Sequence, residues 1–353
     1  MRTGSPTGRA AAQGALRAAA SPPGLVSRFA LLSSRLLFLE EEVLLGGQAV
    51  LEGVMMRSPR NMAVAVRKPG GEIAVLRREI PILGERYPIL KWPVLRGAVV
   101  MIQALVLGIA SLNFSAEAAF EGIEEGEAPV DKAAGKETGK LAGIAIALSL
   151  VASIGVGLAI FFLLPLALTD LVKRFMPALQ NGIVYNLVDG GFRISAFLIY
   201  LYAISLLKDI KRVFEYHGAE HKTVYAYEAR RDLTVENVRV QSRLHPRCGT
   251  SFLLFVMVVS ILVFSLLPTR FPFYVMISPR LALVPLIAGL SYEAIRWSAR
   301  RSNAVARALV RPGMWLQRLT TREPDDTQIA VAIHALQEAL EMERLGSMPA
   351  VPA

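Results

Sequence analysis

The sequence is poor in cysteine and in charge. Its 353 residues include one cysteine, Cys248, and only 19% are charged. A single cysteine excludes an intramolecular disulfide, and soluble domains carry about 25% charged residues. Apolar residues make up 53% of the sequence and gather in long uncharged runs, which are typical of bilayer spans. The composition therefore argues against a purely water-soluble protein and excludes a protein that is disordered throughout.

Acidic residues are outnumbered by basic ones, which gives a net charge of +10 and a pI near 9.9. Lys and Arg that flank membrane helices on the cytosolic side explain this excess better than nucleic-acid binding does. We therefore expect the lipid bilayer as a partner and no nucleic acid.

The N-terminus has no acidic residue before Glu40 and contains five Arg among residues 1–39. This composition suits an organelle transit peptide, a disordered tail or an over-extended start. No compact apolar core with a cleavage site is present, so we do not expect a secretory signal. Residues 1–40 are interpreted as a disordered tail or targeting segment.

Five apolar runs could cross a bilayer. Residues 141–169 and 248–269 are the firmest, because about 20 helical residues span a hydrocarbon core of about 30 Å. Weaker runs cover about 189–207, with Asp189 and Arg193 expected in the first turn, and about 274–295, which prolines interrupt. The fifth run is 97–116.

The distribution of Lys and Arg decides whether 97–116 crosses. If it does not, 33 of the counted Lys and Arg lie on the cytosolic side and four outside; if it does, the division is 17 against 20. The positive-inside rule prefers the first arrangement. We therefore expect a mainly α, polytopic membrane protein with about four transmembrane helices, both termini cytosolic, and 97–116 interfacial or re-entrant.

The soluble parts have signals of their own. Short alternating apolar stretches in 46–80, with a Pro69-Gly70-Gly71 turn, predict a small β-rich cytosolic unit. Residues 326–343 predict a helix capped by Asp325 or Asp326, with Ile329, Ile333, Leu336 and Leu340 on one face and His334 off it. The expected segments are a tail (1–40), a β-rich unit (41–93), an apolar helix (94–116), an acidic linker (117–140), a first transmembrane pair (141–207), a cytosolic His/Cys segment (208–250), a second transmembrane pair (251–295) and a cytosolic helical tail (296–353).

Three of the four histidines and the one cysteine fall within 32 residues. On a helix, His217 and His221 lie one turn apart, and Glu220 projects from the same face. Two imidazoles at i and i+4 are a usual way to offer two ligands to Zn²⁺. His245 and Cys248, separated by two residues in a turn, could supply the rest, so a zinc site is expected at His217, His221, His245 and Cys248.

The number of ligands separates two chemistries. Four protein ligands make a closed, structural site, whereas three leave a position for water on which Glu220 could act as general base. The order His-x-x-Glu-His also fits the inverted zinc-protease signature, a weak signal alone. A third possibility makes Cys248 a nucleophile with a neighbouring His as base and Arg247 lowering its pKa.

Four stretches together resemble a known family. They are 46–57 (GGQAVLEGVMMR), 216–223 (YHGAEHKT), 245–252 (HPRCGTSF) and 320–326 (TTREPDD). The sequence resembles the YqhQ-like bacterial membrane family, domain of unknown function 1385, over about residues 41–343. This resemblance implies a predicted metal-dependent enzyme of the bacterial inner membrane or of a plastid descendant, and it points to the same His, Glu and Cys residues.

The leading interpretation is a metal-dependent hydrolase of unknown substrate, with zinc held by His217, His221 and His245 or Cys248 and with Glu220 as the catalytic base. The alternative is a non-enzymatic membrane scaffold or assembly factor with a structural zinc site. A transporter is a third class, but the spans 141–169 and 248–269 carry no charge at mid-membrane.

Overall fold

A computed structural model describes most of the protein after residue 44. The predicted N-terminal tail and most of the predicted acidic linker lie outside the described residues. These are 45–120, 148–149, 151–246, 248–268, 271–272, 274–299 and 303–347.

The N-terminal part is an antiparallel sheet of four strands in the order β1-β2-β3-β4. Successive side chains of a strand point to opposite faces of the sheet. The apolar residues of β2 and β3 therefore contribute to a core on each face. Gly71, with φ +90°, lies in the predicted turn between the last two strands. The strands are β1 (Gly46–Val50), β2 (Gly53–Arg57), β3 (Asn61–Arg67) and β4 (Ile73–Glu79).

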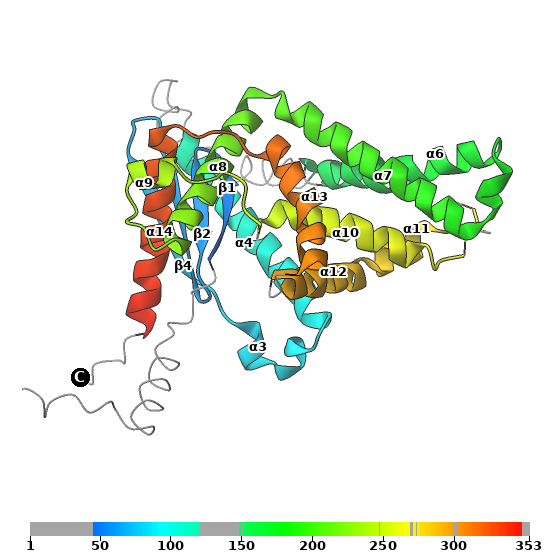
Figure 1. Cartoon of the computed structure of the whole chain (residues 1–353), viewed down its shortest axis with the longest axis horizontal. Helices are drawn as coiled ribbons and strands as arrows, with labels where there is room; N and C mark the ends of the chain where they lie inside the picture. Colours follow the sequence, from blue (N-terminus) through cyan, green and yellow to red (C-terminus); the bar gives the residue numbers. More distant parts are fainter. Residues whose placement is uncertain are drawn as a thin grey trace, which may run out of the picture. The chain divides into compact units, whose positions relative to one another are not determined.

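Helices cover both faces of the sheet (Figure 1). Val54 and Met56 of β2 point to the face covered by α8 (Lys208–Glu228) and α14 (Asp326–Ser347). The predicted apolar face of α14 forms this core, and Asp325 caps the helix by accepting a hydrogen bond from the Gln328 N–H at 2.8 Å. The β-rich unit therefore includes helices from the distant C-terminal half, and α9 (Val235–Arg239) packs beside them.

The second face of the sheet packs against α4 (Leu95–Phe120). Leu107, Phe114 and Ala118 join the core formed by β2 and β3. The opposite side of α4 exposes large apolar residues such as Leu105 and Ile109. The helix thus divides its apolar surface between the sheet and the outside, and α3 (Leu83–Arg86) and η1 (Pro88–Lys91) lead into it.

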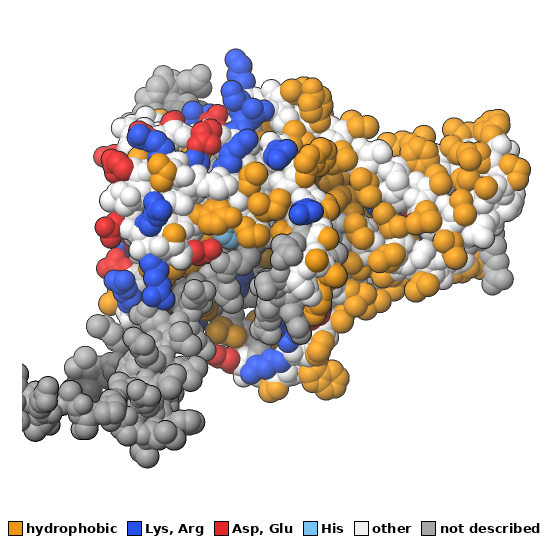
Figure 2. Space-filling model, viewed as in Figure 1, with side chains coloured by type: hydrophobic (Ala, Val, Ile, Leu, Met, Phe, Trp, Pro, Cys, Tyr) orange, Lys and Arg blue, Asp and Glu red, His pale blue; other side chains and the backbone are white. Residues whose placement is uncertain are grey.

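The remaining helices form an apolar bundle beside the sheet. Figure 2 shows hydrophobic side chains over this part, whereas Lys, Arg, Asp and Glu gather over the sheet, α8 and α14. This separation is what a bilayer on one side and water on the other would select. The bundle contains η4 (Ala159–Leu163), a π-helical turn, α6 (Leu164–Lys173), η5 (Pro177–Gln180), α7 (Gly182–Ser205), α10 (Gly249–Phe264), α11 (Ile277–Ala282), α12 (Val284–Ala299) and α13 (Ala304–Thr320).

Three described helices are long and apolar enough to cross a membrane: Leu95–Ala119, Val151–Lys173 and Gly182–Ser205. Two boundaries differ from the expected runs. The run 248–269 becomes α10, whose 16 residues end at Phe264, so it is shorter than the about 20 residues of an untilted span. The run 274–295 is divided into α11 and α12 before Pro285.

Asp189 and Arg193 do not lie in the first turn of their helix, as the sequence suggested. The helix α7 begins two turns earlier, where the Asn181 side chain accepts hydrogen bonds from Ile183 N and Val184 N. Asp189 is buried and contacts Arg193 at 3.1 Å and Arg280 of α11 at 2.8 Å. These contacts form a charged cluster inside the apolar bundle. The i, i+4 spacing agrees with the pair of Asp189 and Arg193, whereas local spacing could not reveal Arg280.

Candidate metal centre

The helix α8 positions His217, Glu220 and His221. An acidic residue, Asp209, lies in its first turn, where it interacts favourably with the helix dipole. The two histidines share one face, with ring centroids 4.4 Å apart. Gly218 lets this helix approach the segment between α13 and α14, because a Cβ there would overlap the Arg322 carbonyl oxygen.

Cys248 reaches this face of α8 from the start of α10. It is the N-cap residue, and its Sγ accepts a hydrogen bond from the Thr250 N–H at 3.4 Å. The distance from Sγ to His217 Nε2 is 3.1 Å. One ligand atom from each of His217, His221 and Cys248 lies within 4.8 Å of the other two. This group offers two nitrogens and one sulfur to a common point.

Backbone carbonyl groups orient both imidazoles. His217 Nδ1 lies 2.8 Å from the Thr320 oxygen, and His221 Nδ1 lies 2.5 Å from the Arg243 oxygen. A carbonyl oxygen only accepts hydrogen bonds, so each Nδ1 is the protonated nitrogen and each Nε2 keeps its lone pair when the ring is neutral. Hydrogen bonds of this kind fix metal-binding histidines in known sites.

His221 has the environment of a neutral ligand. Its side chain is 2% exposed, and burial lowers its pKa below the ordinary value. Nε2 of His221 is buried without a hydrogen bond of good geometry among the described residues. A buried nitrogen lone pair without a donor is unfavourable, and a cation at this point would satisfy it.

Glu220 lies at the edge of the same group. Its Oε2 is 3.5 Å from His221 Nε2, and β1 covers it, since a Cβ on Gly47 would overlap the Glu220 side chain. Burial raises the pKa of Glu220, although His217, His245 and the Gly47 backbone act in the opposite direction. A buried carboxylate beside two imidazoles is suited to accept or hold a proton.

His245 lies apart from the three-ligand group. Its ring packs against Tyr225 with centroids 4.5 Å apart, and its Nε2 is 3.4 Å from Glu228 Oε2. The Gln317 side chain holds its backbone at both N–H and C=O, each at 2.7 Å. These contacts hold His245 beside the three-ligand group, with its ring centroid 5.8 Å from that of His221.

Sequence reasoning missed the residues that support the site. None of them acts through a reactive side chain. Thr320 and Arg243 contribute backbone carbonyl oxygens, and Gly47 allows β1 to lie close to the Glu220 side chain. Gly47 and Thr320 lie within the first and last of the four stretches that carry the resemblance. That location was a usable signal for these two residues. No such signal marked Arg243 or Gln317.

Comparison with known proteins places the sequence in a family. The family described as protein of unknown function (DUF1385) matches residues 92–342. The protein belongs to the DUF1385 family. The uncharacterized protein YqhQ of Bacillus subtilis (strain 168) is 38% identical over 317 residues, which cover 87% of this sequence and 96% of that protein. No solved structure matches it.

The part matched by DUF1385 contains α8 and Cys248, and therefore the whole three-ligand group. The family description assigns no activity. The bacterial relative agrees with a bacterial origin, and the apolar helices agree with a membrane environment.

Proposed function

We propose that this protein is a membrane-bound, metal-dependent hydrolase, with His217, His221 and Cys248 as the ligands of a zinc ion. The observation that carries the proposal is the arrangement of the two imidazoles. Each is held at Nδ1 by a backbone carbonyl group, and one ligand nitrogen of each lies within 4.8 Å of the other and of the Cys248 thiol.

The donor set fits zinc among the common metals. Imidazole and thiolate are the ligands that Zn²⁺ prefers, whereas Mg²⁺ and Ca²⁺ take oxygen ligands. Three protein ligands are also typical of catalytic rather than structural zinc sites. When bound in such a site, zinc supplies Lewis-acid chemistry that activates water for hydrolysis.

Glu220 has the position of the proton acceptor. Its carboxylate lies beside His221 and is shielded from solvent by β1. It can take a proton at Oε2 and return it to a leaving group, which is the role of a general base and acid. Glu228, about two turns further along α8, contacts His245 at 3.4 Å, outside the three-ligand group.

The setting supports a reaction at a membrane surface. The centre lies on α8, directly after the apolar helix α7, and Cys248 begins the apolar helix α10. We place the centre, the sheet and both termini on the cytosolic side of the bacterial plasma membrane, because Lys and Arg are concentrated in these parts. The substrate class stays open among peptides, lipids and small esters.

One observation favours a second function, that of a membrane scaffold with a structural zinc. The centre joins three separate segments: α8, the N-terminus of α10 and the backbone at Thr320. Tying such segments together is the role of a structural metal. In that case zinc would stabilise the fold, and Glu220 would contribute little.

The substitution Glu220→Gln separates the two functions. The purified variant and the wild type are compared on a panel of peptide, phospholipid and small ester substrates, with metal content and melting temperature measured on the same samples. We expect a loss of about a hundredfold or more in hydrolysis rate with unchanged zinc, because removing a general base costs 10²–10⁴-fold. His334→Ala, at a half-buried histidine of α14 outside the centre, is the control and should be silent.

Equal hydrolysis by the Glu220→Gln variant would contradict the base role. Loss of zinc in that variant would contradict it too, since Glu220 would then hold the metal. A wild type that hydrolyses none of these substrates, yet melts at a lower temperature without zinc, would favour the scaffold.

A further inference from the structure

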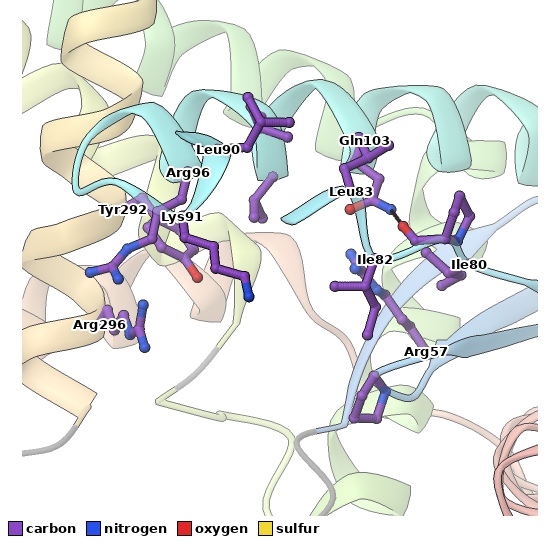
Figure 3. A pocket seen from close by; sticks show the side chains of 14 residues that line it. Arg57, Ile80, Ile82, Leu83, Leu90, Lys91, Arg96, Gln103, Tyr292 and Arg296 are labelled. Atoms are coloured by element: carbon purple, nitrogen blue, oxygen red, sulfur yellow. Dashed lines mark hydrogen bonds between the residues drawn. The ribbon is translucent and has the colours of Figure 1, made fainter. Parts of the chain in front are cut away.

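A cavity of about 410 Å³ opens beside α4, away from the metal centre. Its wall carries four cations from four elements: Arg57 of β2, Lys91 of η1, Arg96 of α4 and Arg296 of α12. None of the residues that line it is acidic. Figure 3 shows Lys91 reaching from η1 between Arg96 and Arg296 on one side and Arg57 on the other.

The positive charge of this cavity is only partly compensated. Glu293 pairs with Arg96, with Oε1 2.6 Å from Nε, and its charge also acts on Arg296. Among the described residues, no carboxylate forms an ion pair with Arg57 or Lys91. Burial lowers the pKa of Arg57, as expected for a guanidinium that is desolvated without a partner. An anion in the cavity would supply the missing charge.

A second cavity of about 460 Å³ adjoins the first; its surface is mainly apolar, although Arg78 and Glu79 also line it. The two cavities share Leu83, Leu90, Val99 and Gln103, and the Gln103 side chain donates a hydrogen bond to the Pro81 carbonyl oxygen at 3.0 Å. The second cavity continues along α4 to Ile102 and Val106, whose side chains are exposed. A cationic compartment therefore leads directly into an apolar one.

The segment around η1, next to the first cavity, has the composition of a membrane-surface segment. Tyr87, Ile89 and Trp92 are exposed around η1, with Trp92 at 65%. Exposed Trp and Tyr beside cations are typical of the headgroup region of a membrane. A cationic compartment beside such a segment is suited to meet phospholipid phosphates.

We propose that the two joined cavities bind an anionic phospholipid, with its phosphate among Arg57, Lys91 and Arg296 and one acyl tail along α4. Guanidinium groups match phosphate oxygens in geometry and charge. A soluble phosphate ester would satisfy the cations equally, but it would leave the apolar compartment facing water. The amphiphilic shape of the site therefore assigns it to a lipid.

The test uses the full-length protein in a mild detergent. Native mass spectrometry measures the binding of palmitoyl-oleoyl phosphatidylglycerol and of phosphatidylcholine with the same acyl tails. We expect phosphatidylglycerol to bind at least about tenfold more tightly, because its net negative headgroup is attracted by the uncompensated Lys and Arg side chains. The double variant Arg57→Gln with Arg296→Gln should lose this preference.

Two further variants keep the test independent of misfolding. Arg231→Gln with Arg318→Gln removes the same charge at exposed sites outside both cavities and should keep the preference. Lys91→Gln changes an exposed side chain on η1 and should weaken phosphatidylglycerol binding several-fold in a protein that melts normally.

Equal binding of phosphatidylglycerol to the wild type and to the Arg57→Gln, Arg296→Gln variant would overturn the proposal. Displacement of phosphatidylglycerol by inorganic phosphate or glycerol phosphate at equal concentration would overturn it as well, because it would show that the apolar compartment contributes nothing. Retained preference over both soluble anions supports the lipid.

Discussion

At the scale of single residues, the centre depends on groups that carry no reactive chemistry. The carbonyl oxygens of Thr320 and Arg243 select the Nδ1–H form of His217 and His221, which leaves each Nε2 for a metal. Gly47 gives Glu220 its space beneath β1. The carbonyl groups of Thr320 and Arg243 therefore orient His217 and His221. The absence of a side chain at Gly47 leaves room for Glu220.

Gly218 offers the sharpest residue-scale prediction. Gly218→Ala places a Cβ against the Arg322 carbonyl oxygen. A backbone atom moves away less easily than the end of a flexible side chain. We expect the free energy of unfolding to fall by about 1–3 kcal/mol, the cost of overpacking a tight contact. Zinc affinity should fall with it, because the same contact positions Thr320 under His217.

Thermal unfolding and metal titration of the purified variant measure both effects. Gly191→Ala is a matched control, since no atom lies within 4 Å of a Cβ at that position of α7. It should leave stability unchanged or slightly raised, because Ala favours a helix over Gly. Unaltered stability and zinc affinity in Gly218→Ala would show that the approach of α8 to the 320–322 segment does not hold the centre together.

At the scale of elements, α4 is as long and apolar as a transmembrane helix, yet one of its faces packs against the sheet. Leu107 and Ala118 are buried against the sheet, whose opposite face belongs to the charged part of the molecule. We propose that the sheet lies in water, which would hold the C-terminal half of α4 at its surface. We then expect the exposed apolar side of α4 to face lipid, as in an interfacial helix.

Cysteine labelling tests this placement. Glu117→Cys at the end of α4 and Arg231→Cys after α8 are introduced singly into a Cys248→Ser background, at two exposed positions. With a membrane-impermeant maleimide, we expect both to react only after the cells are permeabilised. Reaction of both positions in intact cells would mean that α4 crosses the bilayer, because the two apolar helices between Glu117 and Arg231 keep these positions on one side in either arrangement.

At the scale of the whole molecule, the sequence predicted the elements better than it predicted their partners. Alternating residues in 46–80 predicted the strands, and the spacing of Ile329, Ile333 and Leu336 predicted the buried face of α14. Both are local patterns with a fixed period. That α14 covers the same sheet depends on contacts between residues more than 250 positions apart, for which periodicity holds no information.

The candidate site was predictable to the same degree. The sequence predicted His217, His221, His245 and Cys248 as ligands, and the structure brings one ligand atom from each of His217, His221 and Cys248 within 4.8 Å of the other two. The separate position of His245 follows from Gln317 and Tyr225, which no motif connected to it. Arg280 likewise joins Asp189 across 91 residues of sequence. Local spacing thus gave the donors on one helix, whereas tertiary packing decides which further donors meet them.

The metal content of the whole protein tests the central claim most directly. Protein purified in detergent without chelators is analysed by plasma mass spectrometry and by X-ray absorption at the zinc edge. We expect about one zinc per protein molecule with two nitrogens, one sulfur and one light oxygen as neighbours, and loss of zinc in Cys248→Ser but not in His334→Ala. A protein that carries no metal, or zinc that persists in the Cys248→Ser variant, would contradict a centre formed by His217, His221 and Cys248.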